Sequence, residues 1–269
     1  MYKPLIAIFY SALLSAVVWG CGNSGKQSQV EAIAQCDSLP LPVKELVKAV
    51  NANDSAAFAS FISYPLSRPY PLHDIADEAA MRGYYTTIMD DSLREVILTS
   101  PPDAWSEAGW RGWTVADGEY LWIDNDLYNI NYVSARERDM IASLVKRDME
   151  SLPASMRNGW TPEGCYVSER GEVYRIDRAL AERAEPYRLS IYDNVRSLSG
   201  EPRTTYYGAM FTEGTMATPV YSFGEKNGPS VLIEPYLADS DGERVTIVDA
   251  DGNETVATLT KAYWLDIIR

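Results

Sequence analysis

Hydrophobic side chains first recur along the chain at helical spacing. Val43, Leu46, Val47 and Val50 fall at positions i, i+3, i+4 and i+7, which predicts a helix with one buried face. Asp54 follows where it can cap a second helix. Three more helices are expected, over residues 74–89, over residues 91–99, and from the capping box at Ser134 to Pro153.

Before the last of these helices the pattern alternates with a period of two, which is typical of strands. Strands are expected over residues 112–116, 119–124 and 127–133, with a turn at Asp117-Gly118. Tyr120 and Trp122 share one face of the middle strand, whereas Leu121 and Ile123 share the other.

Beyond Trp160 almost every signal indicates a strand or a turn. Short β-type runs are expected at residues 166–167, 173–176, 187–192, 204–211, 220–223, 231–236, 244–248, 255–259 and 263–267. The predicted fold class is therefore α+β. Helices and an antiparallel sheet occupy residues 41–157, and an all-β antiparallel barrel or sandwich occupies residues 158–269.

The N-terminus indicates where the protein resides. Lys3 precedes an uncharged run, Leu5–Trp19, which ends at Gly20-Cys21. This resembles a bacterial lipoprotein signal, and the resemblance implies removal of residues 1–20 and lipidation of Cys21 with diacylglycerol and palmitate-type acyl chains. Residues 21–40 would then tether the protein to the outer membrane, facing the periplasm or the cell surface. The alternatives are a signal peptide cleaved elsewhere and an uncleaved anchor.

Two further cysteines, Cys36 and Cys165, form an even pair in the oxidising compartment that such a signal implies. A disulfide between them would stabilise the fold by about 4–5 kcal/mol in the chain-entropy model, because it closes a long loop. Two buried free thiols are the alternative, since the sequence does not show how far apart the two residues lie.

The charge balance excludes one class of partner. The chain has 38 acidic and 24 basic side chains, and its formal net charge is −14. Nucleic acid is therefore not expected as a partner, because its binding depends on Lys and Arg neutralising phosphates. The expected membrane contact is the lipid on Cys21 rather than a polybasic surface.

Several motifs between residues 41 and 150 resemble a known family. They are the helix exit from Asn53 to Ile62-Ser-Tyr-Pro-Leu66, then Tyr84-Tyr-Thr-Thr-Ile-Met89, Gly109-Trp-Arg-Gly112 and Gly118-Glu-Tyr-Leu-Trp122. They are similar to NTF2-like (SnoaL-like, cystatin-like) domains of many Bacteroidota lipoproteins. The resemblance implies a cone that encloses a pocket, in a family where some members are enzymes and many only bind. The second part of the chain resembles a small β-domain that follows such modules.

Few residues suggest catalysis. His73, the single histidine, has Asp74 as its chain neighbour, but it lies in a proline-rich segment and is interpreted as a loop residue. The acidic clusters at 124–126 and 249–253 are interpreted as hairpin turns rather than calcium loops, since the second lacks the closing glutamate of an EF-hand. No catalytic residue, metal site or cofactor is therefore predicted.

The aromatic residues of the strand region offer a candidate ligand site. Such rings can stack on a sugar or a peptide, although they also fill half-buried sheets. The candidate residues are Trp110, Trp113, Tyr120, Trp122 and Tyr128, with Asp124 as a polar anchor.

These observations predict a lipid-anchored lipoprotein of the cell envelope that acts as a non-catalytic binding module for a glycan, a peptide or an envelope protein. One alternative is an NTF2-like hydrolase or isomerase that uses the pocket of the cone. The other is a protein inhibitor that acts through the β-domain, for which the loop at residues 212–218 is the candidate.

Overall fold

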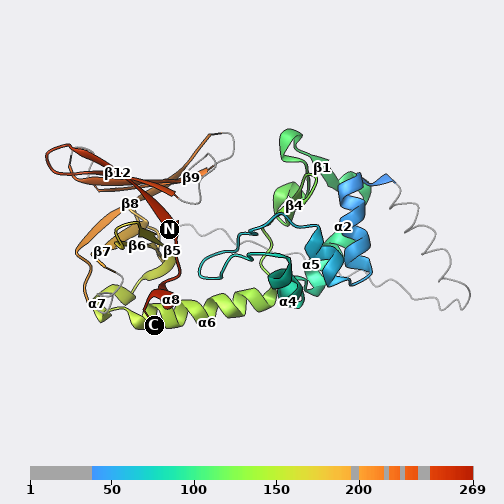
Figure 1. The fold of residues 1–269 in the computed structure, drawn as a ribbon, viewed down its shortest axis with the longest axis horizontal. Helices are drawn as coiled ribbons and strands as arrows, with labels where there is room; N and C mark the ends of the chain where they lie inside the picture. Colours follow the sequence, from blue (N-terminus) through green and yellow to red (C-terminus); the bar gives the residue numbers. More distant parts are fainter. Residues whose placement is uncertain (1–37, 195–199, 215–217, 225–227, 236–242, 269) are drawn as a thin grey trace, which may run out of the picture.

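A computed structural model describes residues 38–194, 200–214, 218–224, 228–235 and 243–268 of the chain. The predicted signal peptide, Cys21 and Cys36 lie outside the described residues. Figure 1 shows a helical region with a small sheet at one end, a larger β-structure at the other, and one long helix that connects them. Among the described helices, none has the length and apolar character needed to cross a membrane.

Four helices form the first region: α2 (Leu41–Asn51), α3 (Ser55–Ser60), α4 (Glu78–Ile88) and α5 (Asp91–Thr99). Asp54 caps α3 as expected, because its carboxylate accepts hydrogen bonds from the backbone N–H groups of Ala56 and Ala57. The prediction that α4 begins at residue 74 is wrong by four residues. Asp77 is the N-cap, whereas the carboxylate of Asp74 binds Lys261 near the other end of the chain.

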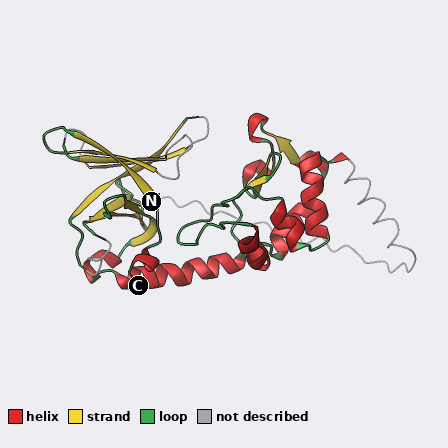
Figure 2. Cartoon of the chain, viewed as in Figure 1, coloured by secondary structure: helices red, strands yellow, loops and turns green. Residues whose placement is uncertain are grey.

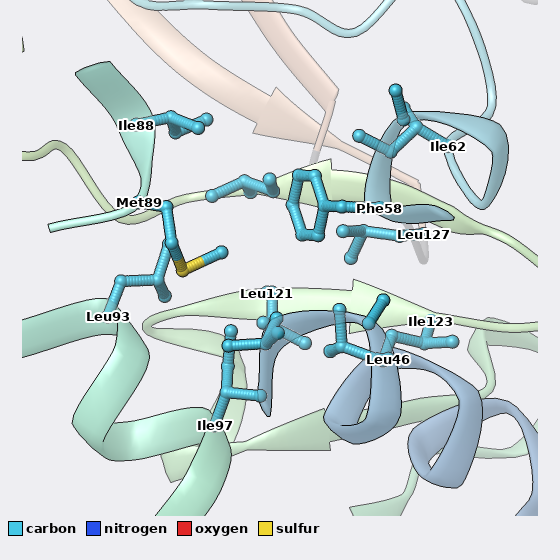
Figure 3. Close-up of a cluster of buried hydrophobic side chains, with 14 of the residues drawn as sticks. Leu46, Phe58, Ile62, Ile88, Met89, Leu93, Ile97, Leu121, Ile123 and Leu127 are labelled. Atoms are coloured by element: carbon cyan, nitrogen blue, oxygen red, sulfur yellow. The ribbon is translucent and has the colours of Figure 1, made fainter. Parts of the chain in front are cut away.

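A small antiparallel sheet packs against these helices. Its strands lie in the order β1 (Trp105–Glu107), β2 (Trp113–Val115), β3 (Leu121–Ile123) and β4 (Leu127–Ile130). Short 3-10 turns at Pro102–Ala104, Gly109–Arg111 and Ala116–Gly118 precede or join the first three strands. Figure 3 shows that aliphatic side chains dominate the core between helices and sheet, among them Leu46, Leu93, Ile97, Leu121, Ile123 and Leu127.

The long helix α6 (Ala135–Ser151) begins at the predicted capping box of Ser134 and Glu137. Two of its carboxylates are fully buried. Glu137 pairs with Arg68 at 2.8 Å, and Asp148 pairs with Arg175 at 2.6 Å. Because eleven residues make about three helical turns, both carboxylates lie on the same face of α6. The helix is thus fixed by a buried ion pair to the first region at one end and to the β-structure at the other.

The β-structure is a closed antiparallel barrel, which is one of the two forms that the sequence predicted. Its strands are β5 (Trp160–Ser168), β6 (Val173–Ala179), β7 (Tyr187–Tyr192), β8 (Thr204–Glu213), β9 (Thr218–Gly224), β10 (Ser230–Pro235), β11 (Glu243–Val248) and β12 (Glu254–Lys261). Each strand pairs with the next in sequence, and β12 closes the barrel on β5. The first of these strands follows the short helix α7 (Ala154–Arg157).

The chain returns to α6 after the last strand (Figure 2). The predicted strand at residues 263–267 is wrong, because Trp264–Ile267 form the short helix α8. The Trp264 indole is completely buried, and its Nε1 donates a hydrogen bond to Ser151 Oγ at 2.6 Å. A turn of helix places this side chain against the end of α6, where it joins a cluster that also contains Leu152 and Met156.

The two faces of the barrel wall differ in chemistry. Tyr174 and Ile176 of β6 pack with the apolar interior cluster of the barrel. Arg175 and Asp177 alternate with them and therefore point to the outer face. This part of the outer face is completely buried and carries charge, whereas the interior is filled with aromatic and aliphatic side chains.

Candidate functional site

The predicted aromatic site divides between the core and the surface. Trp113 and Tyr120 are partly buried and pack against the core, as the alternative interpretation had it. Trp110 and Tyr128 are exposed by 67% and 39%. The buried face of β3 carries Leu121 and Ile123, so Trp122 lies on the opposite, outer face of the sheet. Four of the six predicted residues, counting exposed Asp124, therefore lie on the solvent side.

A tight turn holds Trp110 away from the protein. Gly109 and Gly112 have φ values of 61° and 73°, which side-chain-bearing residues rarely adopt. A Cβ on Gly112 would lie 2.2 Å from the carbonyl oxygen of Ile123, so the turn also needs a glycine to pack against β3. The backbone N–H of Ala108 donates to the carbonyl of Gly112 at 2.8 Å and closes the turn. Trp110 therefore lies at the tip of a hydrogen-bonded turn and points to solvent.

Arg111 connects the turn to the neighbouring strands. Its guanidinium lies 5.2 Å from the ring centroid of Trp122, at cation–π distance. The Tyr128 hydroxyl donates a hydrogen bond to the carbonyl oxygen of Arg111 at 2.9 Å. Trp110, Arg111, Trp122 and Tyr128 are together called the aromatic face.

A bulge in β4 determines where Tyr128 points. Ile123 pairs with Leu127, whereas Trp122 pairs with Asn129, so Tyr128 is the extra residue. Regular alternation would place Tyr128 and Ile130 on one face, but Ile130 is buried in the core and Tyr128 is exposed. A bulge redirects one side chain without moving the strand out of the sheet.

Polar groups border the aromatic face. Asn125 Nδ2 donates to Asp124 Oδ2 at 3.2 Å, and Asn129 Nδ2 donates to Asn131 Oδ1 at 3.1 Å. Burial raises the pKa of Tyr128, while Arg111 lowers it and Asp124 raises it further. Both a cation and a carboxylate thus act on the Tyr128 hydroxyl.

The single histidine lies at a second place, a seam between the first region and the end of the barrel. His73 stacks on Tyr263 with ring centroids 3.9 Å apart, and its Nε2 lies 3.1 Å from Oδ2 of Asp266. The neighbouring Asp74 accepts hydrogen bonds from Lys261 Nζ at 2.8 and 2.9 Å. His73 is thus a loop residue, as expected, and it joins two distant parts of the chain.

Tyr70 extends this seam toward α6. Its hydroxyl accepts a hydrogen bond from the backbone N–H of Trp264 and donates one to Asp148. Burial raises the pKa of Tyr70 strongly, with further contributions from Cys165 and Asp148, so this hydroxyl stays protonated. A cavity of about 50 Å³ between Tyr70, His73 and Asp266 is large enough for water and too small for a substrate.

Beneath the seam a charged cluster is sealed under α6 and α8. Arg175 lies 2.7 Å from Asp177 and 2.6 Å from Asp148, and Arg188 also pairs with Asp177 at 2.7 Å. Burial disfavours the charge on Arg175, but the two carboxylates outweigh it and raise the pKa of the guanidinium. The indole of Trp264 covers Arg175 at 4.7 Å. Two arginines and two aspartates balance each other in a site closed to solvent.

Cys165 lies in the same buried layer as a free thiol. Burial raises its pKa to about 12, so it stays protonated and unreactive at neutral pH. Cys36 lies outside the described residues, so the predicted Cys36–Cys165 bridge stays a prediction. Thiol labelling of the denatured, unreduced protein tests it.

The acidic turns show no metal-binding arrangement. Asp249 Oδ1 accepts hydrogen bonds from the backbone N–H groups of Asp251 and Asn253, as in a hairpin turn. The side chain of Asn253 also donates a hydrogen bond to Asp249 Oδ2. This bond contributes most, and together with the backbone hydrogen bonds it lowers the pKa of Asp249. Within the described ranges no three His, Cys, Asp or Glu side chains form a group that could hold a metal ion.

A larger hollow of about 340 Å³ lies between α2 and α3 and includes Lys48, Ala49, Asp54 and Phe61 in its lining. The candidate inhibitory loop at residues 212–218 includes residues 215–217, which lie outside the described residues.

Sequence patterns did not reveal Arg111, Tyr70 or the buried charges. Arg111 is visible only as part of Gly-Trp-Arg-Gly, which does not show that its side chain stacks on Trp122. Arg175 and Asp177 alternate with buried residues of β6, a pattern that usually indicates a solvent-facing side of a strand.

No model of a known protein family matches the chain. Neither a curated protein nor a solved structure matches it. Function is therefore inferred from the geometry of the described residues.

Proposed function

We propose that the protein is a lipid-anchored, non-catalytic binding module of the cell envelope, and that the aromatic face is its binding surface. The observation that carries this proposal is the exposure of Trp110, which is 67% open to solvent on a hydrogen-bonded turn beside two further exposed or half-buried rings. Exposed tryptophan and tyrosine are enriched in recognition surfaces, because each ring buries a large area when it binds.

The anchor rests on the sequence Val18-Trp19-Gly20-Cys21, which resembles a lipoprotein signal. Two or three acyl chains on Cys21 would hold the protein stably on a membrane, since each buried CH₂ contributes about 0.8 kcal/mol. The proposed location is the outer membrane, and the proposed partner is a glycan, a peptide or a protein of the envelope.

A binding role is favoured over catalysis by how the titratable groups are used. His73 is stacked on Tyr263 and paired with Asp266. These contacts join the first region to the end of the barrel. Fully buried Glu137 is paired with Arg68, as Asp148 is with Arg175. These groups hold structural elements together, and each already interacts with another side chain of the same protein.

The NTF2-like relationship of residues 41–150 is part of the proposal. Helices packed against one face of an antiparallel sheet, in the order helices then strands, support it. The strands β1 to β4 have only three or four residues each, so any such cone would be shallow.

A photo-crosslinking experiment tests the binding surface without knowledge of the ligand. Benzoylphenylalanine replaces Trp110 in one variant and Leu180, which is 69% exposed on the barrel, in a matched control. We expect irradiated cells to yield a defined adduct from position 110 and none from position 180. Equal or absent crosslinking at both positions would contradict the proposal. Cys21→Ser should separately release the protein from the membrane fraction.

A further inference from the structure

The aromatic face offers three kinds of surface chemistry side by side. Trp110 and Tyr128 expose flat rings, and the ring of Trp122 lies beneath the Arg111 guanidinium. Asp124 belongs to the same area, because the Cα of Asp124 lies within 2.8 Å of where a Cβ of Gly112 would stand. Rings, a fixed cation and a carboxylate are therefore held around one turn.

Hydrogen-bonding capacity is mixed rather than uniform. Asp124 supplies acceptors, Arg111 supplies donors, and the amide of Asn129, on the outer face beside Trp122, supplies both. Sugar hydroxyls donate and accept at once, so they match such a border. A purely apolar ligand would leave these groups without partners at a binding surface, which lowers affinity.

Charge further restricts the ligand. Arg111 and Asp124 both influence the Tyr128 hydroxyl, with opposite sign, and a second exposed carboxylate, Asp126, lies in the same turn as Asp124. The chain as a whole carries a formal net charge of −14, which repels anions approaching from a distance. An uncharged ligand avoids this repulsion.

Backbone pairing at the adjacent edge of the sheet is already used. The N–H of Leu127 donates to the carbonyl of Phe61 at 2.9 Å, and the N–H of Ser63 donates to the carbonyl of Leu127 at 3.1 Å. The isolated bridge between Ile62 and Leu127 therefore occupies this edge of β4 at the residue before Tyr128, where a peptide strand would otherwise add. The groups that the aromatic face offers to a ligand at this position are its side chains.

We infer that the aromatic face binds an uncharged glycan chain, whose sugar rings stack on Trp110 and Tyr128 while Arg111, Asp124 and Asn129 bind its hydroxyl groups. This inference rests on the proposed function and names its ligand class. The rings of Trp110 and Tyr128 are both open to solvent, so we expect a chain of several sugar units to reach both.

Isothermal titration of the full mature chain carrying Cys21→Ser tests the inference. The probes are uncharged hexasaccharides of β-1,4-linked glucose, β-1,4-linked N-acetylglucosamine, β-1,3-linked glucose and β-1,4-linked mannose. Polygalacturonate serves as an anionic comparison and a proline-rich decapeptide as a peptide comparison. We expect saturable binding of at least one uncharged hexasaccharide, and at least tenfold weaker binding by Trp110→Ala.

The matched control, Leu180→Ala, removes an equally exposed apolar side chain from the barrel and should bind like the parent protein. Both variants should fold, since neither side chain is buried. The inference fails if no uncharged hexasaccharide binds at millimolar concentration, or if Trp110→Ala binds as well as the parent. If only the peptide or only polygalacturonate binds, and Trp110→Ala abolishes that binding, the aromatic face is still a binding surface and the proposed function stands. The inference that its ligand is an uncharged glycan would then be wrong.

Discussion

The two ends of the molecule use aromatic and charged residues in opposite ways. The first region has a largely aliphatic core and places Trp110, Trp122 and Tyr128 on the outside of its sheet. The barrel fills its interior with tyrosines such as Tyr174 and Tyr187, and it buries arginines and aspartates under the helices outside. An exposed ring is available to a ligand, whereas a buried ion pair holds elements together. The difference suggests that the first region recognises and the barrel supports.

The largest loss of stability is expected when a buried charge beside the barrel is removed. Arg175→Met leaves Asp148 and Asp177 buried with reduced compensation, so the free energy of unfolding should fall by about 3–5 kcal/mol. Urea denaturation followed by circular dichroism measures the loss. Arg178→Met is the matched control, because Arg178 lies on the same strand with its side chain 49% exposed and should cost at most about 1 kcal/mol.

The corresponding change at the other end of α6 should have a smaller effect. Arg68→Met also leaves a buried carboxylate, but Glu137 keeps hydrogen bonds from the Tyr84 hydroxyl and the Ser134 backbone. We expect a loss of about 3 kcal/mol, at the lower end for broken buried pairs. If the two arginine variants lose the same free energy of unfolding, the hydrogen bonds that Glu137 keeps contribute little to stability.

Two tryptophans of the first region sharpen the contrast between core and surface. Trp105 is 3% exposed, and Trp105→Ala should destabilise the protein by about 3 kcal/mol because it leaves a cavity. Trp110→Ala should change stability by less than about 0.5 kcal/mol. Chemical denaturation of both variants decides whether the tight turn at Trp110 is structural or serves binding, since a large loss for Trp110→Ala would make it structural.

Asp90 gives the first region a pH dependence. Although burial raises its pKa, hydrogen bonds from Leu93 N–H, Ala135 N–H and the Tyr132 hydroxyl outweigh this and hold the pKa below its usual value. The stabilisation is therefore present above the unfolded pKa of about 3.9 and is lost as pH falls through the folded value. Asp90→Asn should cost about 1 kcal/mol at pH 7, because an amide nitrogen in place of Oδ2 cannot accept the hydrogen bond from Ala135 N–H. Denaturation at pH 3 should show a smaller difference from the parent, and an equal difference would contradict this account.

A small loss of stability is expected at the seam. Lys261→Met removes the ion pair with Asp74, which is partly exposed, so it should cost about 0.2–1 kcal/mol. Tyr263 still stacks on His73 in this variant. A loss of several kcal/mol in thermal or urea unfolding would show that the seam depends on the ion pair rather than on the rings.

Local signals in the sequence predicted the regular elements well. The bounds of α5, the cap at Asp54 and the capping box of α6 follow from residues within one helical turn, and the structure confirms them. Alternation also predicted an antiparallel β-structure after residue 160, and the barrel confirms one of the two expected forms. What failed depends on distant partners. Trp264 lies in a helix because it packs on α6, more than a hundred residues earlier.

The candidate site was only partly predictable for a similar reason. Alternation correctly separates Trp122 from Leu121 and Ile123, but it does not say which of the two faces meets the helices. The bulge at Tyr128 shifts the alternation by one residue, so Ile130 turns to the core instead of joining Tyr128. Burial of Arg175 cannot be inferred from β6 itself, because the covering helices come from elsewhere in the chain.

The position of Glu137 and Asp148 on α6 has a consequence for how this architecture can change over evolution. Arg68 and Tyr70 are only two residues apart, yet they contact carboxylates about 16 Å apart along the helix axis, because eleven residues rise by that distance. Because two residues span at most about 7 Å, the long side chains of Arg68 and Tyr70 bridge the remaining distance. An insertion in α6 that is not close to whole helical turns would rotate Asp148 away from Tyr70 and Arg175. Among descendants of this chain, length changes in α6 should therefore occur in steps close to whole helical turns.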